Sequence, residues 1–121
     1  MYNVNVKGIF LCCKHAIPRM VAAGGGCIVN ISSNAGIMPR FHDPVYSSSK
    51  GAVNALTRAL ALSHAHQKIR VNAICPGPVE GTRIIDRDLD KAPDGRDSAA
   101  KRFIAASPLV GSALDGRVVC L

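Results

Sequence analysis

Tyr46 and Lys50 are the two residues of this chain whose types and spacing best suit proton transfer. They lie four positions apart in a segment predicted to be helical, so both side chains leave the same face about one turn apart. A phenol has an ordinary pKa near 10 and is a poor acid or base at neutral pH, but a nearby ammonium group favours its ionised form. The spacing therefore indicates an acid–base centre. Taken alone, such a pair is more often an interfacial tyrosine beside a solvated lysine.

A hydroxyl and a rigid turn are predicted to meet this pair at one edge of a sheet. Ser33 follows Cys27–Ser32, a segment rich in branched residues that predicts a buried strand, and residues 69–75 predict the next strand. Open α/β sheets bind ligands at the carboxyl ends of their strands. We therefore expect the Ser33 hydroxyl to face Tyr46, where two hydroxyls hold one carbonyl oxygen. Backbone amides of the turn Pro76–Val79 are expected to bind a planar amide.

The elements that must position these residues alternate between helix and strand. Apolar spacing near 3.6 predicts a helix over 6–23, bent or interrupted at Pro18 and stopped by three glycines, and a second helix over 45–66. The amphipathic stretch 82–106 predicts one or two surface helices broken by a Pro-Asp-Gly turn, and 117–121 is a candidate strand. This order predicts an α/β fold with a parallel sheet. Because an average sheet has about five or six strands, the chain is expected to be part of a larger domain.

Composition and charge limit the possible classes of function. The chain has 121 residues, of which 48% are hydrophobic, enough for one small globular domain. Its net charge of +7 arises in residues 1–70, which hold eight bases and one acid. These bases are spread singly and aromatic residues make up only 4% of the chain, so no nucleic-acid partner is expected. No apolar run approaches the roughly 18 residues of a membrane-spanning helix, so no membrane partner is expected.

The cysteine and histidine patterns argue against disulfide and metal sites. Five cysteines are an odd number without CxxC spacing, and the four histidines form no HExxH motif. The histidines are therefore expected to be surface or core residues, and no metal is expected. Free thiols and the lack of a segment resembling a secretory leader favour a reducing, cytoplasmic location.

Four motifs in order resemble those of the short-chain dehydrogenases/reductases. They are Asn3-Val-Asn5-Val-Lys-Gly, Asn30-Ile-Ser-Ser33, Tyr46-x-x-x-Lys50 and Asn72-Ala-Ile-Cys-Pro76-Gly77, and the resemblance covers residues 3 to about 85. It implies a partial Rossmann-like fold with a doubly wound parallel sheet. In that fold residues 1–121 are the carboxyl-terminal, catalytic half of an NAD(P)-binding domain, and the first βαβ unit is missing.

The resemblance also implies roles for individual residues. Tyr46 is the expected acid/base, and Lys50 assists it and binds the nicotinamide ribose. Ser33 is expected to orient the substrate oxygen, and Asn5 to anchor a water that relays protons through Lys50. The implied reaction transfers a hydride between NAD(P)(H) and a small-molecule carbonyl/alcohol pair. The residues expected to bind the cofactor are Tyr46, Lys50, Pro76, Gly77, Val79 and Thr82.

Both ends depart from the family pattern, and the sequence is expected to be truncated. The Gly-rich turn that binds the pyrophosphate at a helix N-terminus is absent, and Gly24–Gly26 is no substitute because it leads from a helix into a strand. The cofactor is NAD or NADP, and the chain by itself is expected to have little or no activity. A homo-oligomer through helices 6–23 and 45–66 is expected in the full-length protein. The alternative is a non-catalytic fragment that acts only as a subunit-interaction module.

Overall fold

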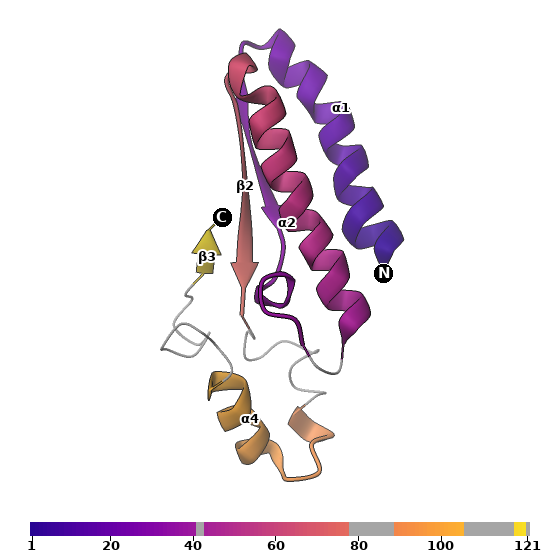
Figure 1. Cartoon of the computed structure of the whole chain (residues 1–121), viewed down its shortest axis with the longest axis vertical. Coiled ribbons are helices and arrows are strands. Elements are labelled where there is room, and N and C mark those ends of the chain that lie inside the picture. The colour runs from indigo at the N-terminus through magenta and orange to yellow at the C-terminus, as the bar shows by residue number, and fades with distance from the viewer. Residues whose placement is uncertain (41–42, 78–88, 106–117, 121) are drawn as a thin grey trace. The chain divides into compact units, whose positions relative to one another are not determined.

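The computed structural model describes residues 1–40, 43–77, 89–105 and 118–120 (Figure 1). These residues belong to two compact units, one built from Met1–Cys75 with the end of β3, and one from Pro76 to Val118. In chain order the elements are the π-helix η1 (Asn3–Gly8), α1 (Ile9–Ala22), β1 (Gly26–Ile31), the 3-10 helix η2 (Asn34–Gly36), α2 (Pro44–His64), the 3-10 helix η3 (Ala65–Gln67), β2 (Ile69–Pro76), α4 (Arg96–Ala105) and β3 (Val118–Cys120).

The first unit contains two parallel strands, β1 and β2, which pair with each other. The pairing runs from Gly26 opposite Ile69 to Ile31 opposite Ile74, and the strand order is β1-β2-β3. The backbone N–H of Ser32 extends this ladder by donating to the carbonyl oxygen of Ile74 at 2.8 Å. The predicted α/β fold with parallel strands is confirmed, and so is the short strand near the end of the chain.

Both long helices cover the same face of the strand pair (Figure 1). The core joins Cys13 and Ile17 of α1 to Ile69 and Val71 of β2. On β1, by contrast, Val29 is 50% exposed. The prediction of a buried strand is therefore wrong for one face of β1. Side chains alternate across a strand, and within the first unit α1 and α2 cover the same side of the strand pair.

Helix α1 runs without a break through Pro18. Proline removes the hydrogen bond that its missing N–H would donate to the carbonyl four residues earlier, here that of Lys14. Pro18 and Lys14 both lie on the exposed side of α1, where that carbonyl remains open to water. The predicted helix over 6–23 is confirmed, although its first residues belong to η1, and the predicted interruption is wrong.

Helix α2 begins with a capped first turn that carries Tyr46. Asp43 is the N-cap, and its Oδ1 accepts a hydrogen bond from the backbone N–H of Tyr46 at 3.1 Å. Pro44 occupies the first helical position, where its missing N–H is not needed. The helix ends at His64, and Lys68, with φ of 58°, turns the chain into β2. The predicted helix over 45–66 is confirmed, with its last residues in the 3-10 turn η3.

The second unit contains a short helix with its own small core. Leu89 and Ala99 are buried against each other, and α4 begins after the predicted Pro93–Gly95 turn. Asp94 accepts hydrogen bonds from Ser98 at 2.6 Å and from Arg102 at 2.8 Å. The bond from Ser98 holds the pKa of the exposed Asp94 carboxyl below its ordinary value. Residues 82–88 and 106 of the predicted segment 82–106 lie outside the described residues.

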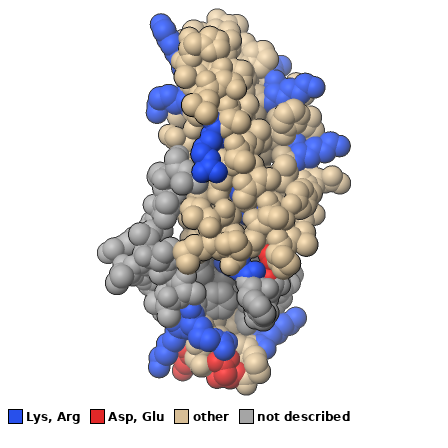
Figure 2. Space-filling view, in the orientation of Figure 1, with Lys and Arg blue, Asp and Glu red and all other residues tan. Residues whose placement is uncertain are grey.

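The described residues also bear on the expectations about nucleic acid, membrane, metal and disulfides. On the face drawn in Figure 2, Lys and Arg side chains are scattered over the upper part, and several gather beside acidic side chains at the lower end. In the described part of the chain, no helix has the length and apolarity needed to span a bilayer. No three His, Cys, Asp or Glu side chains there are grouped to hold a metal ion. Four cysteines are free thiols: Cys12, Cys13, Cys27 and Cys75.

The neighbouring thiols of Cys12 and Cys13 test this packing. Cys12 is exposed, whereas Cys13 is 3% exposed, and burial raises the pKa of the Cys13 thiol. We expect iodoacetamide at pH 8 to alkylate Cys12 faster than Cys13 by about tenfold or more, because a buried thiol reacts only after local opening. Tandem mass spectrometry of the shared peptide measures both rates. Equal rates in the native chain, and not only in denaturant, would contradict the placement of α1 on the sheet.

Candidate active site

Tyr46 and Lys50 lie on successive turns of α2 and face each other. The Nζ atom of Lys50 is 5.8 Å from the centroid of the Tyr46 ring. The guanidinium carbon of Arg40 lies 6.0 Å from the same centroid. Both distances are within the range of cation–π attraction. The structure thus brings together the pair that the spacing predicted, and it adds Arg40, which no local pattern in the sequence singles out.

The ammonium group of Lys50 is hydrogen-bonded to the end of β1. Nζ donates a hydrogen bond to the backbone carbonyl of Ile31 at 3.0 Å. Ile31 is the last residue of β1, two positions before Ser33. A lysine ammonium has three donors, so this bond leaves others for a ligand. This hydrogen bond holds the charged Nζ of Lys50 between the Tyr46 ring and the end of β1, where the chain leaves the sheet.

Ser33 begins the short turn η2 directly after the strand. It is 5% exposed, and its Oγ accepts from the backbone N–H of Ala35 at 3.2 Å. The same hydroxyl donates to Oδ1 of Asn34 at 3.3 Å, which is long for a bond between two oxygens. The position just beyond the strand is the predicted one. A role in orienting a substrate oxygen requires the proton to turn away from Asn34, and this role stays a prediction.

Asn5 lies in η1 and is joined to the first turns of α2. Its Nδ2 donates to Oγ of Ser49 at 3.1 Å, and that hydroxyl donates to the carbonyl of Tyr46 at 2.8 Å. π-Helical turns occur often at functional sites because they displace a side chain from the regular helical path. Asn5 is thus placed beside the turn of Tyr46 and Lys50, and its relay of protons stays a prediction. The sequence did not predict Ser49 as a residue of the site. Its position directly before Lys50 is a feature that could have suggested it.

The residues predicted to bind the cofactor are only partly described. Pro76 is the last residue of β2 and Gly77 follows it, at the carboxyl end of the strand as predicted. Val79 and Thr82 lie outside the described residues.

The glycines between α1 and β1 fit a helix-to-strand turn. Gly24 has a φ of +87° and Gly25 a φ of +140°, and a Cβ on Gly25 would lie 2.8 Å from the carbonyl oxygen of Lys68. These conformations favour glycine for steric reasons. A strand, not a helix N-terminus, follows them, so they do not form a pyrophosphate cradle of the kind that helix N-termini provide.

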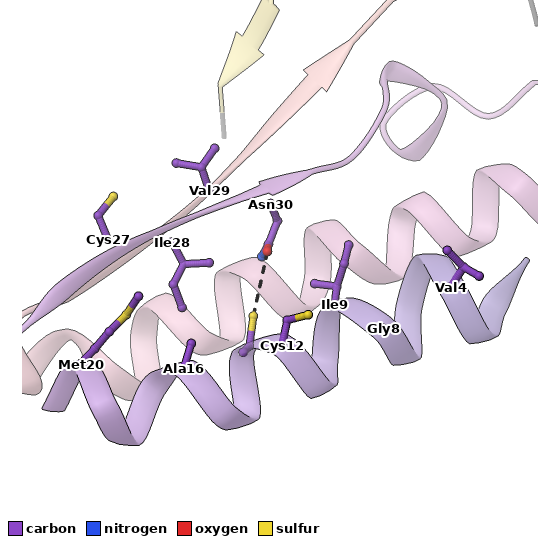
Figure 3. A pocket seen from close by; sticks show the side chains of 11 residues that line it. Val4, Gly8, Ile9, Cys12, Ala16, Met20, Cys27, Ile28, Val29 and Asn30 are labelled. Atoms are coloured by element: carbon purple, nitrogen blue, oxygen red, sulfur yellow. Dashed lines mark hydrogen bonds between the residues drawn. The ribbon is translucent and has the colours of Figure 1, made fainter. Parts of the chain in front are cut away.

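An apolar groove lies at the free edge of β1 rather than around Tyr46. It has a volume of about 540 Å³ and lies between α1 and β1, and none of the predicted catalytic residues lines it. Figure 3 shows Met20 and Ala16 of α1 opposite Ile28 of β1, and the Cys13 thiol donates a hydrogen bond to Oδ1 of Asn30 at 3.9 Å between the two elements. The predicted catalytic residues therefore lie outside this groove.

Comparison with known proteins gives one consistent result. Residues 1–92 match the family model of the short chain dehydrogenases. The chain is 42% identical over 106 residues to an uncharacterized oxidoreductase of Thermotoga maritima, covering 88% of this chain and 41% of that protein. It is 43% identical over 100 residues to the 2-(R)-hydroxypropyl-CoM dehydrogenase of Xanthobacter autotrophicus, covering 83% and 39%. A solved NAD⁺-bound xylitol dehydrogenase is similar with a TM-score of 0.80 and 30% identity, covering 91% and 45%. The chain spans less than half the length of these relatives.

The cap of α2 offers a direct test of how Tyr46 is positioned. Asp43→Ala removes the acceptor of the Tyr46 N–H and is expected to lower the free energy of unfolding by about 1 kcal/mol. Asp43→Asn keeps an acceptor and is expected to lower it by less than about 0.5 kcal/mol, because asparagine caps helices about as well. Urea titration followed by circular dichroism measures both. Equal stability of the two variants would mean that this cap does not hold the first turn.

Proposed function

Since the chain belongs to the short chain dehydrogenase family, we propose that its residues form the catalytic half of an oxidoreductase. The enzyme transfers a hydride between NAD(P)(H) and a small-molecule carbonyl/alcohol substrate. One observation carries the proposal. The ammonium of Lys50 lies 5.8 Å from the Tyr46 ring and 3.0 Å from the carbonyl of Ile31, at the strand end that leads to Ser33. A phenol, a fixed cation and a hydroxyl at one strand end are the parts that proton transfer to a carbonyl oxygen requires.

In the proposed mechanism Tyr46 is the acid and base. Its hydroxyl gives a proton to the substrate oxygen during carbonyl reduction and takes it back during alcohol oxidation. Ser33 donates a hydrogen bond to the same oxygen after its proton turns away from Asn34. Lys50 supplies positive charge beside the phenol while the proton is away. Asn5, held near this turn through Ser49, anchors a water that resupplies the proton through Lys50.

The residues present fit one end of a dinucleotide. Tyr46 and Lys50 bind the nicotinamide ribose, and the bound NAD(P)H supplies the hydride. Gly24 and Gly25 form a helix-to-strand turn, so the pyrophosphate and adenine must bind elsewhere, and both NAD and NADP remain open. The chain by itself is therefore expected to have little or no activity. The remaining cofactor-binding residues are Pro76, Gly77, Val79 and Thr82.

The proposal also includes a domain assignment and a cellular location for the chain. Residues 1–121 form part of one NAD(P)-binding, Rossmann-like domain with a larger parallel sheet. The four described cysteines are free thiols, which supports a reducing, cytoplasmic location.

A chimera tests the catalytic assignment. In it, this chain replaces the stretch of the Xanthobacter 2-(R)-hydroxypropyl-CoM dehydrogenase that it matches over 100 residues. We expect the chimera to form NAD(P)H from 2-(R)-hydroxypropyl-CoM, measured by absorbance at about 340 nm. Tyr46→Phe is expected to lower kcat by about 100- to 10,000-fold, because general acid–base catalysis contributes that much.

Tyr2 provides the matched control for this experiment, since the chain has two tyrosines. Tyr2 donates or accepts one exposed hydrogen bond with Ser48 and has no proposed role in catalysis. Tyr2→Phe is expected to keep kcat within about twofold of the parent chimera. An active Tyr46→Phe chimera would refute the acid/base assignment. An inactive parent chimera that folds and binds NAD(P)H would favour the alternative of a non-catalytic fragment.

A homo-oligomer through α1 and α2, the helices predicted over 6–23 and 45–66, is a second part of the proposal. Phe10 is 48% exposed and Leu62 is 82% exposed. A groove lined by Tyr2, Phe10 and Leu56, among others, runs along the same helices. Exposed apolar residues of this size on two helices are typical of an interface between subunits.

Light scattering of the 121-residue chain and of Phe10→Glu tests this interface. We expect the parent chain to have at least twice the mass of a monomer, and the charged variant to shift toward the monomer, because a buried unpaired carboxylate opposes association. Lys101→Glu, an exposed charge change in α4 and outside both helices, is the control and is expected to keep the mass of the parent. A monomeric parent chain would contradict the interface.

A further inference from the structure

Ser32 ties three elements together just before Ser33. It is 3% exposed, and its Oγ donates to the backbone carbonyl of Lys50 at 3.0 Å. Its backbone N–H donates to the carbonyl of Ile74 in β2 at 2.8 Å. A carbonyl oxygen has two lone pairs, so Lys50 can accept this bond in addition to its bond within α2. One buried serine therefore fixes the end of β1 against both β2 and α2.

Gly36 touches the same peptide of α2 from the other end of the turn. A Cβ at Gly36 would lie 2.6 Å from the carbonyl carbon of Lys50, 2.8 Å from its oxygen and 2.9 Å from Nδ2 of Asn54. Backbone atoms cannot yield at such distances without a shift of the helix or the turn. Glycine is required here because of space, since Gly36 is not among the residues with positive φ.

The turn between these two contacts is short and internally bonded. The N–H of Gly36 donates to the carbonyl of Ser33 at 3.0 Å, and the N–H of Ala35 donates to its hydroxyl at 3.2 Å. Ser32, just before η2, is thus hydrogen-bonded to the Lys50 peptide, and Gly36, at the end of η2, packs against the same peptide. This peptide lies one helical turn after Tyr46. Ser33 has little freedom to move relative to that helix.

We propose that Ser32 and Gly36 are positioning residues, which clamp the Lys50 peptide and thereby set the separation between the hydroxyls of Ser33 and Tyr46. The inference rests on the proposed function for its effect on catalysis, whereas the clamp itself is a property of the chain. Neither residue is proposed to act on substrate, because the buried Ser32 hydroxyl is bonded to the Lys50 carbonyl and Gly36 has no side chain. A displacement of about 1 Å at such a position lowers a rate by about a hundredfold.

The first test observes Tyr46 without any assay of activity. The 121-residue chain is labelled with 3-fluorotyrosine in a Tyr2→Phe background, which leaves one fluorine resonance. Gly36→Ala and Ser32→Ala are expected to shift this resonance. The control is Gly51→Ala, next to Lys50, where an added Cβ would lie 3.7 Å from the carbonyl oxygen of Gly36, an ordinary contact. This control is expected to leave the resonance in place, and the same response from all three variants would overturn the clamp.

The second test separates positioning from simple destabilisation. In the chimera, at a temperature where circular dichroism shows every variant folded, Gly36→Ala is expected to lower kcat by about 10- to 100-fold with KM within about threefold. Gly51→Ala is expected to keep kcat within about twofold. If Gly36→Ala does not fold, Ser32→Ala, which only removes a hydroxyl, decides the question with an expected loss of about tenfold in kcat. Unchanged kcat in the folded variants would overturn the proposal.

The two tests keep this inference apart from the proposed function. An inactive parent chimera together with a shifted fluorine resonance in Gly36→Ala and Ser32→Ala would refute the function and support the clamp. An active chimera whose folded clamp variants keep full kcat would support the function and refute the positioning role.

Discussion

Lys50 is the point at which the end of β1 and the helix α2 are held together. Its ammonium donates to the carbonyl of Ile31, its own carbonyl accepts from Ser32, and its backbone lies against Gly36. All three partners belong to residues 31–36, so this stretch cannot slide along α2 without leaving a buried polar group unpaired, which costs about 1–3 kcal/mol. Tyr46 precedes Lys50 by one helical turn. The same residue that joins these elements therefore supplies the charge that the proposed chemistry needs.

Most of the fold was predictable because its signals are local. Branched residues in Cys27–Ser32 and 69–75 predicted β1 and β2 to within one residue, and apolar spacing near 3.6 predicted α1 and α2. Which face of a strand is covered depends on elements outside that strand, so the 50% exposure of Val29 was not predictable from its own segment. The groove beside β1 has another cause, because among the described strands β1 pairs with β2 alone and its other edge has no strand partner.

The site was predictable where spacing alone sets the geometry. Four positions on a helix place Lys50 beside Tyr46 whatever surrounds them. The contact of Ser49 joins segments that are distant in the sequence, and that of Gly36 depends on a close approach of two backbones. Arg40 lies six positions before Tyr46 but outside α2, so helical spacing does not place it. Such contacts leave no local pattern. A serine beside another serine, as at residues 32 and 33, likewise gives no sign of which hydroxyl caps a turn and which binds the helix.

A double-mutant cycle on kcat in the chimera tests most directly whether the hydroxyls of Ser33 and Tyr46 act on one oxygen atom. The four proteins are the parent chimera, Ser33→Ala, Tyr46→Phe and the double variant. If both hydroxyls serve one proton-transfer event, their effects are not independent, and the double variant is expected to be about as slow as Tyr46→Phe alone. A double variant slower by the full product of the two single losses would contradict a shared centre.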